Sequence, residues 1–119
     1  MDPTACNLLF AYGTLGPAFE PLAGDWEADA VRGRLYDLGP HPILVGWDDP
    51  SAGWVEGHVR ALLPGELTER LDPYEGVGEG PFRRIVCTTR AGRTSWVYVY
   101  TEDVPEGARG PLSRWDRSL

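Results

Sequence analysis

The chain has 119 residues, of which 42% are hydrophobic and 24% charged, and its formal net charge is −7. A chain of this length typically forms one domain and buries roughly two-thirds of its unfolded surface, so it can build a core without disulfides or structural metals. The acidic balance argues against nucleic acid and anionic membrane surfaces as partners, because both are bound through basic residues. All 11 basic residues are arginine, which excludes chemistry that needs a lysine amine.

Cysteine usage and the N-terminus indicate the compartment. Cys6 and Cys87 are the two cysteines, too few for a disulfide framework or a zinc site. The first residues lack the basic start and long apolar core of a signal peptide, and no apolar run reaches the ~18 residues that span a bilayer. We therefore expect a reduced, soluble, cytoplasmic protein.

The 15 glycines and 11 prolines favour short strands and turns over long helices. The pattern of apolar residues predicts strands at 7–12, 28–38 (with Gly33 as a bulge), 43–45, 54–63, 82–89 and 94–101. The last two flank a hairpin-like turn at 91–93.

One helix is predicted at 66–72, where Leu67 and Leu71 share a face and Glu66 can pair with Arg70. Pro73 should end or kink it. The fold class is thus α+β, a small mostly-β domain with a curled or barrel-like mixed sheet and one or two short helices. We expect residues 1–101 to form this domain and residues 102–119 to be a polar, partly disordered C-terminal tail.

Several kinds of site find no support in the sequence. His41 and His58, the two histidines, have no second ligand at a recognised metal-binding spacing, so each is interpreted as a packed or loop residue. No G-x-S-x-G elbow is present, and Cys87 within a strand is interpreted as an inert core thiol. The glycines at 76–80 follow no strand and open no helix, so they are a weak signal for a phosphate loop.

Two segments remain as candidates. Tyr12-Gly13-Thr14-Leu15 follows an apolar strand, and Gly13 allows a turn whose backbone N–H groups could bind a carboxylate. The alternative is a plain strand-end turn.

The second candidate is Leu71-Asp72-Pro73-Tyr74-Glu75-Gly76. A single carboxyl here could move protons if a partly apolar cleft raised its pKa toward neutrality. The alternative is a solvated glutamate in a turn, and local pattern alone favours it.

Taken together, these segments resemble the γ-glutamylcyclotransferase-like superfamily, including its γ-glutamylamine cyclotransferase and AIG2-like branches. That family is similar in having Y-G-[ST]-L after its first strand and L-D-x-x-E-G before an aromatic-x-Arg strand. Its G-x-L-Y, V-x-G-x-V and closing aromatic strands are matched in order by segments 31–39, 54–59 and 96–100. Phe82 departs from the family, which often has Tyr there, so any contact of that hydroxyl is lost.

The resemblance implies a reaction without metal, nucleotide or other cofactor, acting on a small γ-glutamyl molecule to release 5-oxoproline and a free amine or amino acid. It further implies that Tyr12, Gly13, Thr14 and Leu15 bind the substrate and that Glu75 is the catalytic acid and base. A non-catalytic module that binds small carboxylates or proteins, on the same fold, is the alternative. Another is a tailoring enzyme that removes a protective γ-glutamyl group from a metabolite.

Overall fold

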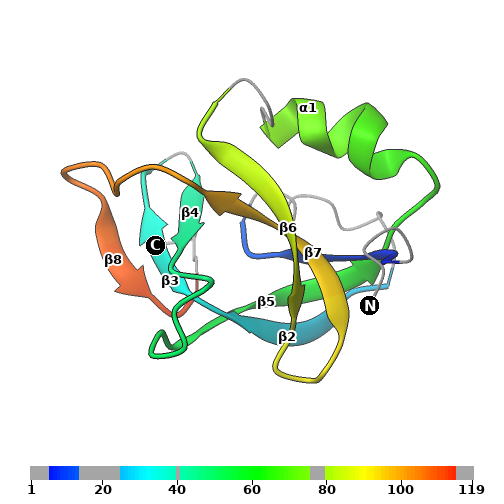
Figure 1. Ribbon diagram of the computed structural model, residues 1–119, viewed down its shortest axis with the longest axis horizontal. Helices are drawn as coiled ribbons and strands as arrows, with labels where there is room; N and C mark the ends of the chain where they lie inside the picture. The colour runs from blue at the N-terminus through cyan, green and yellow to red at the C-terminus, as the bar shows by residue number, and fades with distance from the viewer. Residues whose placement is uncertain (1–5, 14–24, 40, 76–79, 115–119) are drawn as a thin grey trace.

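A computed structural model of the chain describes residues 6–13, 25–39, 41–75 and 80–114. Strands dominate these residues and one short helical segment lies beside them, as Figure 1 shows. This confirms the expected small, mostly-β domain. In the described part of the chain, no helix is both long and apolar enough to cross a membrane.

The larger sheet is mixed and open. Its strands run in the order β2 (Glu27–Arg32), β5 (Trp54–Ala61), β1 (Leu8–Ala11), β7 (Thr94–Tyr100) and β6 (Phe82–Thr88). β1 is parallel to β7 and antiparallel to β5, whereas β2–β5 and β6–β7 are antiparallel pairs. Because β2 and β6 are edges of this sheet, it does not close into a barrel.

A second, three-stranded sheet has the order β4 (Pro42–Val45), β3 (Arg34–Asp37) and β8 (Arg109–Leu112), all antiparallel. The single strand expected at 28–38, with a bulge at Gly33, was therefore wrong, because the segment forms β2 and β3 in different sheets. Gly33 has φ +153°, and a Cβ there would lie 2.7 Å from Leu44 Cδ1. Glycine thus lets the chain leave one sheet and enter the other at a tightly packed point.

The five-stranded sheet has a separate apolar cluster on each face. Side chains alternate along a strand, so Phe10 of β1 joins one cluster while its neighbours Leu9 and Ala11 join the other. The first cluster contains Leu35 and Leu44 of the smaller sheet, so the two sheets pack together through it. The second cluster contains residues of the helical segment and of β7, which places that segment on the opposite face.

The helical segment begins at Glu66 and runs through a π-helical stretch, η2 (Leu67–Leu71), into α1 (Asp72–Glu75). Of the two expected effects of Pro73, to end or to kink the helix, the first does not occur, because helical structure continues to Glu75. A proline inside an α-helix clashes with the carbonyl four residues before it, and here the residues that precede α1 form a π-helical stretch. The predicted Glu66–Arg70 ion pair is confirmed.

The segment after residue 101 contributes a strand. β8 pairs with β3, and the Arg109 guanidinium donates to buried Asp37. All four residues of β8 are exposed, so backbone pairing and this ion pair hold the strand in place rather than apolar burial.

Candidate active site

The end of β1 carries the first candidate segment. Tyr12 and Gly13 follow β1 directly, whereas Thr14 and Leu15 lie outside the described residues. The half-buried Tyr12 side chain packs against the first cluster, and its hydroxyl donates a hydrogen bond to the Tyr98 carbonyl at 2.5 Å. β7 therefore fixes the start of this loop.

A glycine in β5 lets the backbone of β1 approach closely. An added Cβ at Gly57 would lie 2.4 Å from the Ala11 carbonyl oxygen and 2.7 Å from Phe10 Cζ. The strand pair β1–β5 has no room for any side chain at this position. The G of the V-x-G-x-V pattern thus sets the path of β1 immediately before Tyr12.

Glu75, the second candidate, is the last residue of α1, and its side chain lies outside the described part of the structure. The helical segment that carries it is anchored to the sheet at both ends. The first anchor is at Glu66 and the second is at Asp72.

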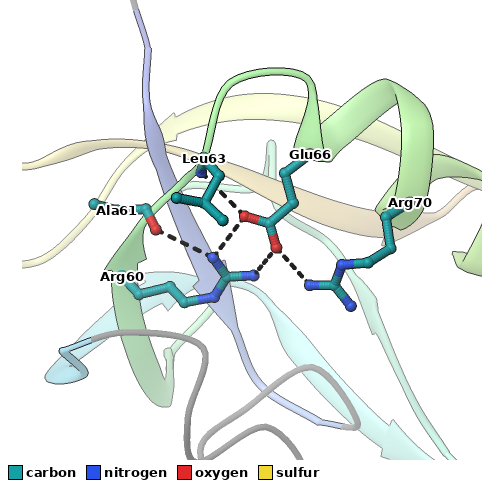
Figure 2. Close-up of polar contacts among 5 residues, drawn as sticks. All are labelled: Arg60, Ala61, Leu63, Glu66 and Arg70. Atoms are coloured by element: carbon teal, nitrogen blue, oxygen red, sulfur yellow. Dashed lines mark hydrogen bonds and ion pairs between the residues drawn. The ribbon is translucent and has the colours of Figure 1, made fainter.

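Arg60 of β5 holds the beginning of the segment (Figure 2). Its Nη1 and Nη2 donate to Glu66 Oε1 and Oε2 at 2.9 and 2.5 Å, and Nη1 also donates to the Ala61 carbonyl at 3.1 Å. Glu66 accepts further bonds from the Leu63 N–H and from Arg70. The Arg60 side chain is fully buried and that of Glu66 is 8% exposed. The hydrogen bonds from Arg60 outweigh burial and lower the pKa of Glu66 to about 2, so it is a carboxylate at neutral pH.

Asp72 holds the other end of the segment. Its Oδ1 and Oδ2 accept from Arg84 Nε and Nη2 at 2.8 and 3.0 Å, and Oδ1 also accepts from the Tyr98 hydroxyl at 2.7 Å. Arg84 and Tyr98 are direct partners across β6 and β7. The Arg84 guanidinium is further fixed 4.2 Å from the centroid of the Trp96 ring. Asp72 lies three residues before Glu75, so this anchor fixes the backbone that presents the candidate carboxyl.

Tyr98 links both candidate segments. Its carbonyl accepts from Tyr12 and its hydroxyl donates to Asp72, so one residue of β7 contacts the start of the loop and the start of α1. The parallel pairing of β1 and β7 makes this possible, because the two neighbouring strands run in the same direction and end on the same side of the sheet. The structure therefore ties Tyr12 and the first residue of α1 to one residue of the sheet, with the Tyr12 side chain packed on the face opposite to the helical segment.

Sequence reasoning missed Asp72, Arg84 and Tyr98 as parts of this arrangement. Asp72 and Arg84 stand within the L-D-x-x-E-G and aromatic-x-Arg patterns, which was the available signal. Tyr98 alternates with valines in β7 and resembles any strand aromatic. Phe82, where the family often has Tyr, lies 5.4 Å from the Tyr100 ring and 5.9 Å from His41, measured between ring centroids.

The described residues also include the side chains that were considered as metal ligands or nucleophiles. Among them, no group of three or more His, Cys, Asp or Glu side chains is arranged to hold a metal ion. His58 packs edge-on against Trp26, with ring centroids 6.5 Å apart. Burial, with smaller contributions from Cys6 and Asp29, raises the pKa of Cys87 to about 12, so this thiol is a poor nucleophile.

Comparison with known proteins shows the family and the fold of the chain. The model of a family described as "Gamma-glutamyl cyclotransferase, AIG2-like" matches residues 9–117. Among solved structures, an uncharacterized protein from Pyrococcus horikoshii is similar in fold, with a TM-score of 0.63 and 18% sequence identity over 91% of this chain and 88% of that one. No curated protein matches the sequence.

Proposed function

Because the chain belongs to the AIG2-like family of γ-glutamyl cyclotransferases, matching its model over residues 9–117, we propose that it is an enzyme that releases 5-oxoproline from a γ-glutamyl compound. The second product is the free amine or amino acid that was bonded to the γ-carbonyl. The fold and the family support cyclotransferase chemistry in general, and the substrate and the residue roles below are our proposal.

The proposed reaction is an intramolecular displacement. The α-amine of the γ-glutamyl group attacks its own γ-carbonyl carbon, a new C–N bond closes a five-membered ring, and the former amide C–N bond breaks. One proton leaves the attacking amine and one reaches the departing nitrogen, so no water or redox partner is consumed. Effective molarities for well-oriented groups reach about 10⁵ M or more, so holding the substrate curled supplies much of the rate.

Each candidate segment has a role in this scheme. The loop of Tyr12, Gly13, Thr14 and Leu15 would bind the γ-glutamyl group through backbone N–H groups, toward the α-carboxylate or the amide oxygen. Glu75 would accept the proton from the amine and return it to the leaving nitrogen, which a carboxyl does best when its pKa is near the working pH.

The observation that carries the proposal is the link through Tyr98. Two segments that are about 60 residues apart in the sequence are tied to one residue of β7, through the Tyr12 hydroxyl at 2.5 Å and the Asp72 carboxylate at 2.7 Å. An arrangement that holds a substrate loop and a proton-transferring helix in a fixed relation is what an intramolecular reaction with one acid–base group requires.

The test is turnover by a matched pair of variants. Purified protein is incubated with γ-glutamyl amino acids, γ-glutamyl amines and glutathione, and 5-oxoproline is measured. Glu75→Gln should fold normally and lose about 10²- to 10⁴-fold in rate, the usual contribution of general acid–base catalysis. Glu69→Gln, which changes an exposed carboxyl of the same helical segment, is the control and should keep the wild-type rate.

Near-normal turnover by Glu75→Gln would reject the role of this residue. No 5-oxoproline from folded wild type, together with thermal stabilisation by 5-oxoproline or a γ-glutamyl ligand, would favour the binding module instead.

A further inference from the structure

Tyr98 stands out because it is almost fully buried, 3% exposed, and still makes polar contacts in two directions. It lies in β7, in register with Arg84 of β6, and belongs to the apolar cluster beneath the helical segment. A buried phenol hydroxyl needs a hydrogen-bond partner, and here Asp72 accepts from it at 2.7 Å. A phenylalanine would fill the same space in this cluster, so packing alone does not account for the hydroxyl.

The hydroxyl acts on a carboxylate that is already paired. Arg84 alone supplies two hydrogen bonds to Asp72, of 2.8 and 3.0 Å, and thereby balances its charge. The bond from Tyr98 comes from a different strand and a second direction. Two donors from neighbouring strands restrict both the distance and the rotation of the carboxylate, and hence the start of α1.

The backbone carbonyl of Tyr98 holds the second element, the start of the loop after β1. The Tyr12 hydroxyl donates to the Tyr98 carbonyl, so the start of the loop after β1 and the first residue of α1 are both hydrogen-bonded to the same residue of β7. Both elements are thus attached to the same residue of the sheet.

From these contacts we propose that Tyr98 is a positioning residue for the reaction: its hydroxyl, through Asp72, sets where α1 presents Glu75 relative to the loop at Tyr12. The inference rests on the proposed function, because it assigns Tyr98 a place in that chemistry. In this scheme Tyr98 is assigned no proton-transfer step of its own.

The decisive variant is Tyr98→Phe, which removes the hydroxyl and leaves the carbonyl that Tyr12 uses. Since Arg84 still pairs with Asp72, the variant should fold. With the γ-glutamyl substrate identified by the 5-oxoproline assay, kcat should fall roughly 10- to 100-fold, as expected when a catalytic group is slightly misplaced. KM should change little, because the loop that binds the substrate keeps its bond to β7. The pH profile of kcat should also shift, because the proton-transferring group moves to a new environment.

Tyr36→Phe is the matched control, because Tyr36 lies in β3 of the other sheet and is partly exposed. It should leave kcat, KM and the pH profile unchanged. A Tyr98→Phe variant with wild-type kcat and pH profile, or with an altered KM alone, would overturn the proposal.

A second measurement does not depend on turnover. Hydrogen–deuterium exchange of the peptide that covers residues 66–75 should become faster in Tyr98→Phe, while exchange in β2 and β5 stays as in wild type. Unchanged exchange at 66–75 would overturn the inference even in an active enzyme. If wild type makes no 5-oxoproline, the proposed function fails, and the exchange result still decides whether Tyr98 holds α1.

Discussion

The buried ion pair at the beginning of the helical segment allows a quantitative test. Glu66→Gln keeps the size and shape of the side chain and removes its charge. The variant offers a single amide oxygen to the donors that surround both carboxylate oxygens in the wild type. The fully buried Arg60 guanidinium would then lack its countercharge. Removing one partner of a buried ion pair costs about 3–5 kcal/mol, and we expect about 3 kcal/mol because the glutamine oxygen keeps part of the network.

The assay is reversible unfolding in urea at pH 7, followed by circular dichroism and tryptophan fluorescence, with thermal melting in parallel. A loss of this size should lower Tm by about 10 °C or more in a domain of this length. The control is Arg70→Gln, which removes the other, 48% exposed partner of Glu66. An exposed ion pair contributes less than about 1 kcal/mol, so the control should unfold nearly as wild type does.

The dependence on pH follows from the same pair. Hydrogen bonds from Arg60 lower the pKa of Glu66 from 4.5 in the unfolded chain to about 2, so its contribution is complete above pH 4.5. It is lost as the pH falls from 4.5 toward 2, because the native carboxylate must then be protonated. The difference between wild type and Glu66→Gln should therefore shrink over that range. A variant as stable as Arg70→Gln at pH 7, or a difference that grows on acidification, would refute the reasoning.

Two further predictions concern β5 and the core thiol. Gly57→Ala should lower the free energy of unfolding by about 1–3 kcal/mol and reduce turnover, because its methyl would collide with the Ala11 carbonyl 2.4 Å away. The control, Gly53→Ala, places a methyl with nothing within 4 Å and should leave the free energy of unfolding almost unchanged. Equal effects of the two substitutions would contradict this account. In a Cys6→Ser variant, alkylation of Cys87 at pH 8 should be about two to three orders of magnitude slower in native than in urea-unfolded protein, because burial raises the pKa of this thiol to about 12. Similar rates in the two states would show that the thiol is accessible.

Most strands were predictable because their signals are local. Alternating apolar residues located β5, β6 and β7 to within a residue or two at each end. The error at 28–38 arose because β2 and β3 adjoin in the sequence, and only the pairing of β2 with β5 and of β3 with β4 shows that they belong to different sheets. All four residues of β8 are exposed, so its pairing with β3 left no pattern of buried apolar residues to detect.

For the candidate site, the sequence offered a prediction only for its motif residues. Tyr12, Gly13 and Glu75 stand in the segments that carried the resemblance, and the family model covers these positions, while their roles stay a prediction. The anchors were hidden because their partners are distant in sequence: Asp72 meets Arg84 and Tyr98 at separations of 12 and 26 residues. Arg60 looked like any strand arginine, since burial of a charge is decided by tertiary packing and not by its neighbours in the chain.

The central place of β1 has a consequence for how the protein is made. β1, which precedes the other described strands in the sequence, lies between β5 and β7, and its register sets Leu9 beside the distant Trp96. Pairings between such distant residues raise the contact order and slow folding, because a long loop must close before they form. Until β7 emerges, β1 has an open edge that faces other nascent chains. The five-stranded sheet, and with it the joining of the Tyr12 loop to α1, is therefore completed only after the residues around Tyr98 are available to pair.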